Sequence, residues 1–257
     1  MSKSGLIGAT GFVGSNLLRQ TSFDFCYNRQ TIEQIRGEEF DRLVCAAPQA
    51  KKWWANQHPE ADKHSILELI AHLNTVHTHT FILISSIDVF PVICGVDESY
   101  DCHQQNNHPY GQNRLFLEEA VRDRFPSTYV LRLPGLFGKG LKKNVIYDLL
   151  THNQLEKLHP NSQFQWYDLS RLWQDVQAVL AASLPLVVLA TEPVRTDAIQ
   201  QRFFAETAIG AEATDPVSYD IHTQYAQSLG GQGNYLCSTE QVLEQIGTFV
   251  MTERGRQ

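Results

Sequence analysis

Short apolar runs alternate with amphipathic segments through the first half of the chain. The apolar runs predict strands at residues 5–8, 23–28, 41–48, 80–86 and 128–133. Apolar positions at helical spacing predict helices at residues 12–20, 31–40, 58–76 and 109–125. The run at 80–86 is almost continuously apolar, which is typical of a parallel strand buried on both faces. The alternation predicts an α/β protein whose parallel sheet is built from βαβ units.

The pattern changes after Gly140. The second half contains predicted helices at residues 170–183, 195–208 and 238–250 and one predicted strand at 185–190, whereas residues 211–235 are mostly loop. Ser238 and Gln241 have the spacing of a capping box at the start of the last helix. We therefore expect a domain at residues 1–140 and a smaller lobe at residues 141–257, which interleaves with the last sheet strands.

Composition and charge narrow the class of protein. The 257 residues are 42% hydrophobic and 19% charged, and the net charge is −7. A chain of this size can bury a substantial core, and its acidic balance argues against nucleic acid or a membrane surface as a partner. None of the five cysteines has C-x-x-C spacing, no apolar run is long enough to span a membrane, and the first residues lack the pattern of a signal peptide. We expect a cytoplasmic protein.

A glycine-rich turn follows the first predicted strand. Gly8, Gly11 and Gly14 have G-x-x-G-x-x-G spacing between that strand and the next helix. A dinucleotide pyrophosphate needs backbone N–H groups at close approach, which a Cβ atom would block, and it is attracted by the positive end of a helix. The turn therefore predicts a dinucleotide-binding site, and its candidate contacts are Gly8, Thr10, Gly11, Phe12, Val13 and Gly14.

Together with three later stretches, this turn resembles the extended short-chain dehydrogenase/reductase superfamily, the epimerase/dehydratase/reductase branch that acts on nucleotide sugars. The later stretches are "DRLVCAAP", "FILISSIDVF" and "YVLRLPGLFGKG". The resemblance covers about residues 5–140, with some likeness to 4-keto-sugar reductases. It implies a Rossmann-like doubly wound parallel sheet and an NAD(P)-dependent oxidoreductase or epimerase acting on a carbonyl or hydroxyl group of a sugar-nucleotide-like substrate.

The resemblance also implies the catalytic residues. Tyr110 is the acid/base, Ser86 is the hydroxyl that holds the substrate oxygen (Ser85 is the rival), and Arg114 stands where the family has lysine. Arginine lowers the pKa of a nearby tyrosine and donates to a ribose, but it stays protonated and cannot relay a proton. The alternative is therefore a catalytically degenerate dinucleotide-binding protein that acts as a sensor or partner subunit.

The end of the second predicted strand bears on cofactor choice. Asn28 and Arg29 lie there and no acidic residue does, which favours NADP, with NAD left open. By resemblance, the chain passes the cofactor at Ala46, Ala47 and Pro48, and Pro134 lies where the family's backbone meets the nicotinamide amide.

Several other side chains have two interpretations. Trp53 or Trp54 lines a ligand pocket or packs against the C-terminal lobe, and Trp166, Tyr167 and Arg171 are candidates for substrate contact. His77 and His79 lack a third metal ligand nearby, so we predict an exposed turn and no metal. The expected partner is a small molecule such as a sugar nucleotide, and a homodimer is left open.

Overall fold

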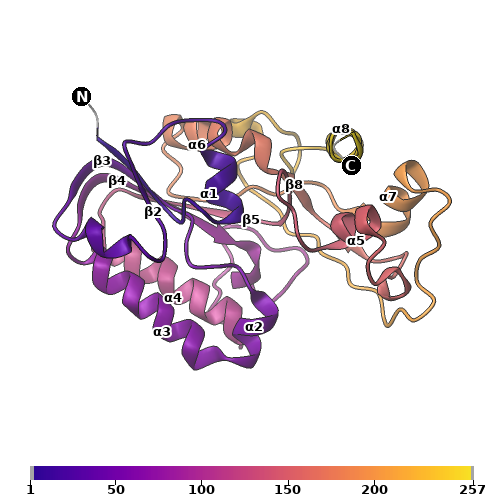
Figure 1. The fold of residues 1–257 in the computed structure, drawn as a ribbon, viewed down its shortest axis with the longest axis horizontal. Coiled ribbons are helices and arrows are strands. Elements are labelled where there is room, and N and C mark those ends of the chain that lie inside the picture. The colour runs from indigo at the N-terminus through magenta and orange to yellow at the C-terminus, as the bar shows by residue number, and fades with distance from the viewer. Residues whose placement is uncertain (1–2, 256–257) are drawn as a thin grey trace. The chain divides into compact units, whose positions relative to one another are not determined.

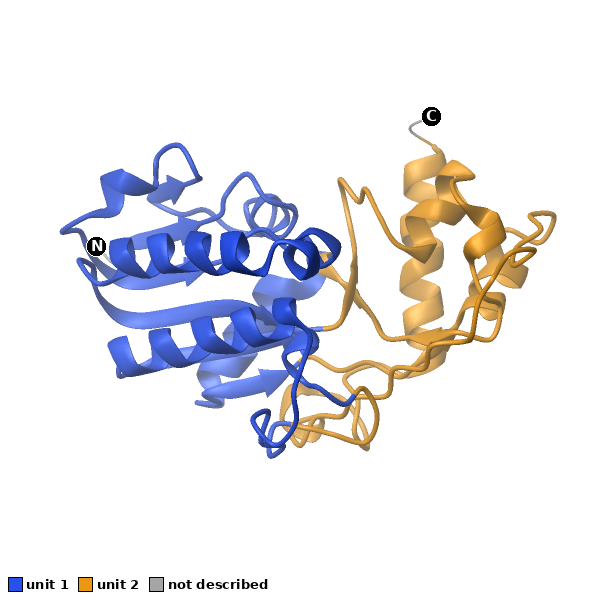
Figure 2. Cartoon of the chain, turned by 90° about the horizontal axis from the view of Figure 1, so that it is seen from below, with its two compact units in different colours: residues 1–92, 98–133, 170–188 blue, residues 93–97, 134–169, 189–257 orange. Residues whose placement is uncertain are grey.

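The computed structural model describes residues 3–255 and divides the chain into two compact units (Figure 2). Unit 1 comprises residues 1–92, 98–133 and 170–188, and unit 2 comprises residues 93–97, 134–169 and 189–257. The chain thus passes from one unit to the other several times, and each unit contains segments from distant parts of the sequence.

Unit 1 is built on a parallel six-stranded sheet with the strand order β2-β1-β3-β4-β5-β9. The strands are β1 (Ser4–Ile7), β2 (Phe25–Tyr27), β3 (Glu39–Cys45), β4 (His77–Ser86), β5 (Thr128–Leu133) and β9 (Leu186–Val188). The chain leaves β1 to one side for β2 and returns to the other side for β3. In α/β proteins, ligands bind where the strand order reverses in this way, which here is at the carboxyl ends of β1 and β3.

Helices cover both faces of this sheet, as the predicted doubly wound fold requires. In Figure 1, α1 (Phe12–Leu17) and α6 (Leu172–Ala181) lie on one face, and α3 (Pro59–Leu73) and α4 (Pro109–Arg124) lie side by side on the other. The core under α3 and α4 includes the stacked rings of Phe81 and Phe125, whose centroids are 4.5 Å apart. The Rossmann-like α/β fold predicted from the sequence is confirmed.

The prediction of a helix at residues 31–40 is wrong. Only a 3-10 turn forms, at Ile32–Ile35, and β3 already begins at Glu39. Gly37 has a φ of +75°, in the left-handed region where glycine is favoured, and it breaks the helical path. The buried Phe40 and the buried run at residues 43–45 then belong to a strand that enters the core.

A short helix, α2 (Lys52–Gln57), was not predicted. Within this helix only Ala55 is buried, so the sequence contains no apolar stripe from which the helix could be inferred. Several predicted helices are also shorter than expected, since α1 ends at Leu17, α6 spans only Leu172–Ala181, and the helix predicted at residues 195–208 spans only Thr196–Phe203.

In its described residues, unit 2 contains two small sheets and three α-helices. Strand β6 (Gly135–Phe137) pairs in parallel with β8 (Trp166–Asp168), and β7 (Gln163–Phe164) pairs antiparallel with β10 (Val194–Arg195). The helices are α5 (Val145–Thr151), α7 (Thr196–Phe203) and α8 (Thr239–Arg254). The predicted capping box is confirmed, because Ser238 and Gln241 bond each other's backbone at the start of α8.

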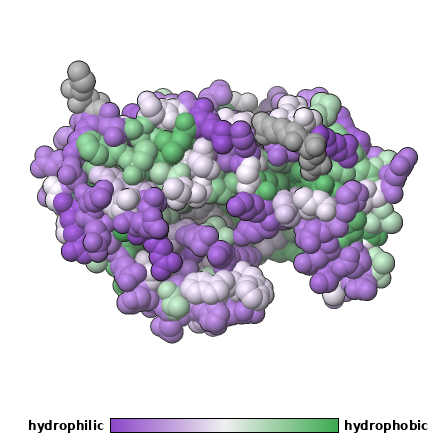
Figure 3. Space-filling view, viewed as in Figure 1, coloured by the Kyte–Doolittle hydropathy of each residue, from purple (hydrophilic) through white to green (hydrophobic). Residues whose placement is uncertain are grey.

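The surface shown in Figure 3 is mainly hydrophilic, with hydrophobic groups gathered over the region of α1 and β2. Leu18 and Phe25, from these segments, are about 40% exposed. Strand β2 is at the edge of the sheet and has only three residues, so it offers little backbone for pairing with another chain. Within residues 3–255, no helix is both long enough and apolar enough to cross a membrane.

Candidate functional site

The glycine turn joins β1 closely to α1. Gly8 has a φ of +84°, and a Cβ on it would lie 2.7 Å from the carbonyl oxygen of Ala46. A Cβ on Gly14 would lie 2.2 Å from the carbonyl oxygen of Gly8. Both positions therefore require glycine so that the turn can pack against the end of β3 and against itself.

Gly11 has a different environment. Its φ is an ordinary −74°, and the only neighbour of an added Cβ would be the Gly8 carbonyl oxygen at 3.2 Å. Gly11 is exposed, and α1 has no side-chain cap at its first N–H groups. An open glycine before uncapped helical amides fits the pyrophosphate of a dinucleotide, because a side chain here would occupy the space that the anion needs.

The ends of β2 and β3 lie beside this turn. The N–H groups of Gly8 and Ala9 both donate to the carbonyl of Tyr27, and Ala46 N–H donates to the carbonyl of Ile7. Asn28 uses its side-chain oxygen to accept the N–H groups of Gln30 and Thr31, at 2.8 and 3.2 Å. The Asn28 side chain thus shapes the turn after β2.

Arg29 lies at the tip of that turn. It is exposed and forms no ion pair within the described residues. Ala47 and Pro48 continue the chain beyond Ala46 and are joined by a cis peptide bond.

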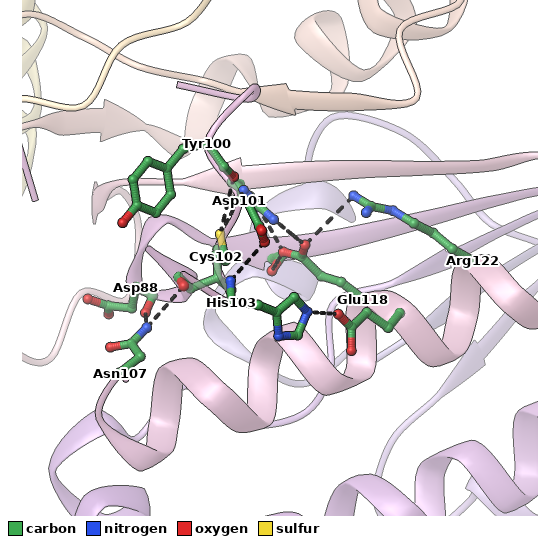
Figure 4. Close-up of polar contacts among 12 residues, drawn as sticks. Asp88, Tyr100, Asp101, Cys102, His103, Asn107, Glu118 and Arg122 are labelled. Carbon is green, nitrogen blue, oxygen red and sulfur yellow. Dashed lines mark hydrogen bonds and ion pairs between the residues drawn. The ribbon is translucent and has the colours of Figure 1, made fainter. Parts of the chain in front are cut away.

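The two serines at the end of β4 have different partners. Ser85 donates its hydroxyl to Glu118, a fully buried carboxylate on α4 that also accepts three bonds from Arg132. Arg122 lies 3.7 Å from the same carboxylate (Figure 4). The Ser86 oxygen instead accepts the N–H of Asp88 at 3.1 Å, so its own proton is not used in that bond. This distinction favours Ser86 over Ser85 as the hydroxyl available to a ligand.

The start of α4, which carries Tyr110, is fastened to the short turn Ile87–Val89 that follows β4. The Asn107 amide donates to the carbonyls of Asp88 and Val89, at 2.9 and 3.0 Å (Figure 4). A Cβ on Gly111 would lie 2.2 Å from the Asp88 carbonyl, so glycine permits this close approach. Sequence reasoning missed Asn107 and Gly111, although both lie within three residues of Tyr110.

Two further contacts fix the first turn of α4. His108 caps it by accepting the Gly111 N–H at Nδ1, and Asn56 of α2 accepts the Tyr110 N–H at 2.9 Å. Helix α2 therefore positions the candidate tyrosine. Its first residue, Lys52, forms an ion pair of 2.7 Å with Asp88, which follows Ser86 by two residues.

Arg114 is buried against an acidic partner. Its two terminal nitrogens donate to the two oxygens of Asp62 at 2.9 and 3.0 Å, and one of them also donates to the Gln49 carbonyl. The side chains of Arg114 and Asp62 are only 6% and 5% exposed. The guanidinium lies over the Tyr110 ring, 4.3 Å from its centroid.

Asp62 was missed by sequence reasoning, but a signal was present. It precedes Ile66 by four residues and Leu69 by seven, which puts a carboxylate on the apolar stripe of α3. A charged residue in such a stripe requires a buried partner.

Electrostatics keep Tyr110 protonated. Burial raises the pKa of Tyr110, the Arg114 charge opposes this effect, and the Asp88 charge adds to it, with a net shift upward. Burial, together with the Lys52 charge, lowers the pKa of His108. At neutral pH the site thus holds a neutral tyrosine hydroxyl, which can donate a proton, beside a neutral imidazole.

The remaining candidates lie in varied surroundings. Trp53 is 72% exposed, and Trp54 packs on the ring of His58, with centroids 5.2 Å apart. Arg171 pairs with Asp175. Pro134, Trp166 and Tyr167 belong to unit 2, where both aromatic side chains are buried. His77 and His79 lie in β4, rather than in the expected turn, and no metal-binding group of His, Cys, Asp or Glu occurs within residues 3–255.

The sequence matches no protein-family model, and no curated protein matches it. Solved structures similar over nearly the whole chain include UDP-glucose 4-epimerase of Thermotoga maritima with UDP-glucose, at 14% identity and a TM-score of 0.74, covering 99% of both chains. The dTDP-4-dehydrorhamnose reductase of Bacillus anthracis in complex with NADP has 12% identity and a TM-score of 0.74, covering 98% of this chain and 99% of that one.

A third similar structure is the UDP-N-acetylglucosamine 4-epimerase of Methanobrevibacter ruminantium in complex with UDP-N-acetylmuramic acid. It has 12% identity and a TM-score of 0.73, and the match covers 100% of this chain and 99% of that chain. Identities this low establish the fold alone. The chain therefore has the Rossmann-like α/β fold that these nucleotide-sugar epimerases and reductases share.

Proposed function

We propose that the protein is an NAD(P)-dependent oxidoreductase or epimerase that acts on a carbonyl or hydroxyl group of a sugar nucleotide. The observation that carries this proposal is the attachment of α4 to the turn that follows β4. Asn107 and Gly111 bring the Tyr110 turn against the backbone of Asp88, beside Ser86. Both groups thus lie at the carboxyl edge of the sheet, the edge that also carries the glycine turn after β1.

The dinucleotide is proposed to bind at Gly8, Gly11 and Gly14, with Thr10, Phe12 and Val13 completing the turn and Ala46, Ala47 and Pro48 beside it. When bound, it supplies or accepts the hydride. Exposed Arg29 suits a 2′-phosphate, which favours NADP. Similar solved structures hold either cofactor, NADP in the Bacillus anthracis reductase and NAD in MoeE5 with UDP-glucose, so they support a nicotinamide dinucleotide and the preference for NADP rests on Arg29.

The chain's own residues bind the substrate oxygen and donate the proton to it. Ser86 donates its free hydroxyl proton to that oxygen, while Asp88 N–H holds the serine in place. Tyr110, which its raised pKa keeps protonated at neutral pH, donates its proton to the same oxygen as reduction occurs. Arg114, over the ring, stabilises the tyrosinate that remains.

The substrate class is taken from the similar structures and needs a direct test. The protein would be incubated with NADPH or NADH and a panel of UDP- and dTDP-linked sugars and 4-keto sugars. Cofactor oxidation and the epimer composition would be measured. Turnover of any panel member supports the proposal. Tight cofactor binding with no turnover on the whole panel would instead support the degenerate dinucleotide-binding alternative.

A further inference from the structure

We propose that Asp62 is a positioning residue for Tyr110, and that it acts through Arg114. In this arrangement the carboxylate on α3 holds the guanidinium of α4 flat against the tyrosine ring and offsets its charge. The inference deepens the proposed function and rests on it only for its effect on turnover, because the contacts and the tyrosine titration are independent of any substrate.

The guanidinium of Arg114 and the carboxylate of Asp62 match in geometry. Two nitrogens of Arg114 meet the two oxygens of Asp62 at 2.9 and 3.0 Å, as a planar fork meets a planar carboxylate. Asn113 donates to the same carboxylate at 2.9 Å and to the Pro59 carbonyl at 3.1 Å. Three donors from α4 thus converge on one buried side chain, which fixes the rotation of α4 relative to α3.

Asp62 affects Tyr110 because it holds the Arg114 guanidinium in place. Arg114 follows Tyr110 by one helical turn, and its guanidinium carbon is 4.3 Å from the ring centroid. Because both terminal nitrogens are bonded to Asp62 and one also to Gln49, the guanidinium is held in this place. Asp62 therefore determines where the positive charge lies relative to the tyrosine.

The charges around Tyr110 come from several elements. Arg114 of α4 lowers the pKa of the tyrosine, while Asp62 of α3 and Asp88, after β4, raise it. Lys52 of α2 is paired with Asp88, and His108 lies with its ring centroid 6.2 Å from that of Tyr110. Removal of the Asp62 charge leaves Arg114 uncompensated in a buried position, so the tyrosine should become more acidic.

The test is a titration of Tyr110 by NMR of protein labelled with ¹³C at the tyrosine ζ carbon, with Tyr110→Phe used to assign the signal. In Asp62→Asn, the Tyr110 pKa should fall by about one unit or more. In Asp62→Glu, which keeps the charge, it should stay closer to the wild-type value. An unchanged or raised Tyr110 pKa in folded Asp62→Asn would overturn the proposal.

The matched control is Glu118→Gln. Glu118 is also a buried carboxylate paired with an arginine, and it follows Arg114 by four residues on α4. This variant should lose thermal stability as Asp62→Asn does, but it should leave the Tyr110 pKa unchanged. A shift equal to that of Asp62→Asn would mean that the effect is a general loosening of α4, and would contradict the proposal.

A second comparison remains decisive if Asp62→Asn does not fold. Arg114→Gln and Asp62→Asn/Arg114→Gln leave no uncompensated buried cation. If Asp62 acts on Tyr110 mainly through Arg114, the Tyr110 pKa of these two variants should differ by clearly less than the roughly one unit expected for Asp62→Asn in the presence of Arg114. A difference of about one unit or more would show that Asp62 acts on Tyr110 directly and not through Arg114. A wild type without turnover would affect the proposed function but none of these titrations.

Discussion

Ser85 and Ser86 are adjacent in sequence but differ in what their hydroxyls do. Ser85 is bound to a buried carboxylate, whereas the Ser86 hydroxyl retains a proton that it can donate. Ser86→Ala should therefore reduce kcat by about 10²–10³-fold with little effect on stability, as expected for loss of a donor to a developing oxyanion. Ser85→Ala should instead lower the free energy of unfolding by about 1–3 kcal/mol, since Glu118 loses a partner.

Steady-state kinetics and urea unfolding of the two serine variants provide the comparison. If Ser85→Ala lost the activity and Ser86→Ala retained it, the assignment of the two hydroxyls would be reversed.

Arg114 and lysine are not interchangeable in this structure. Lysine has no planar fork, so it cannot meet both oxygens of Asp62 and the Gln49 carbonyl in the same way. Arg114→Lys should lower the free energy of unfolding by about 1.5–3 kcal/mol, the contribution of a hydrogen bond to a charged group. Chemical denaturation measures this loss. A fully stable Arg114→Lys protein would show that the fork is dispensable.

At the scale of elements, the glycines of the turn have different roles: we expect Gly14 to matter for folding and Gly11 for cofactor binding. A Cβ on Gly14 would overlap the Gly8 carbonyl, whereas a Cβ on Gly11 meets only one atom, at 3.2 Å. Gly14→Ala should lower the free energy of unfolding by about 1–3 kcal/mol. Gly11→Ala should keep its stability but bind NADPH at least tenfold more weakly, about 1.4 kcal/mol. Fluorescence titration measures the NADPH affinity. A folded Gly11→Ala protein with wild-type affinity would exclude the turn as the cofactor site.

The preference for NADPH can be tested at Arg29, which follows the end of β2. Arg29 is exposed at the tip of the turn, and the Asn28 side chain shapes that turn. Arg29→Ala should weaken NADPH binding about tenfold or more, the equivalent of a charge-assisted hydrogen bond, and leave NADH binding nearly unchanged. Calorimetry with both dinucleotides measures the two affinities. Equal losses for NADPH and NADH would mean that Arg29 does not distinguish a 2′-phosphate.

At the scale of the whole molecule, the sequence pattern predicts the sheet better than the site. The strand at Thr128–Leu133 was predicted at its observed bounds, because its apolar run ends at Pro134. The helix predicted at residues 31–40 forms only a short turn at Ile32–Ile35, and helix α2, whose local periodicity is weak, was not predicted. The partners of the candidate residues also escaped prediction.

Those partners come from distant segments, which explains the failure. Asp62 lies 52 residues before Arg114, and Asn56 lies 54 residues before Tyr110. Periodicity reveals which side of a helix is buried but not which residue faces it from another helix. The sequence could therefore suggest a tyrosine and a cation one turn apart, whereas the pairing of that cation with a carboxylate required the packed structure.

The central claim is that Tyr110 donates the proton in a dinucleotide-dependent reaction, and Tyr110→Phe tests it most directly. The ring should pack over Arg114 as before, so NADPH affinity should remain near that of wild type. The account predicts that kcat on any substrate found in the panel falls by about 10²–10⁴-fold, the contribution of a positioned acid or base. Wild-type turnover by a folded Tyr110→Phe protein would contradict it.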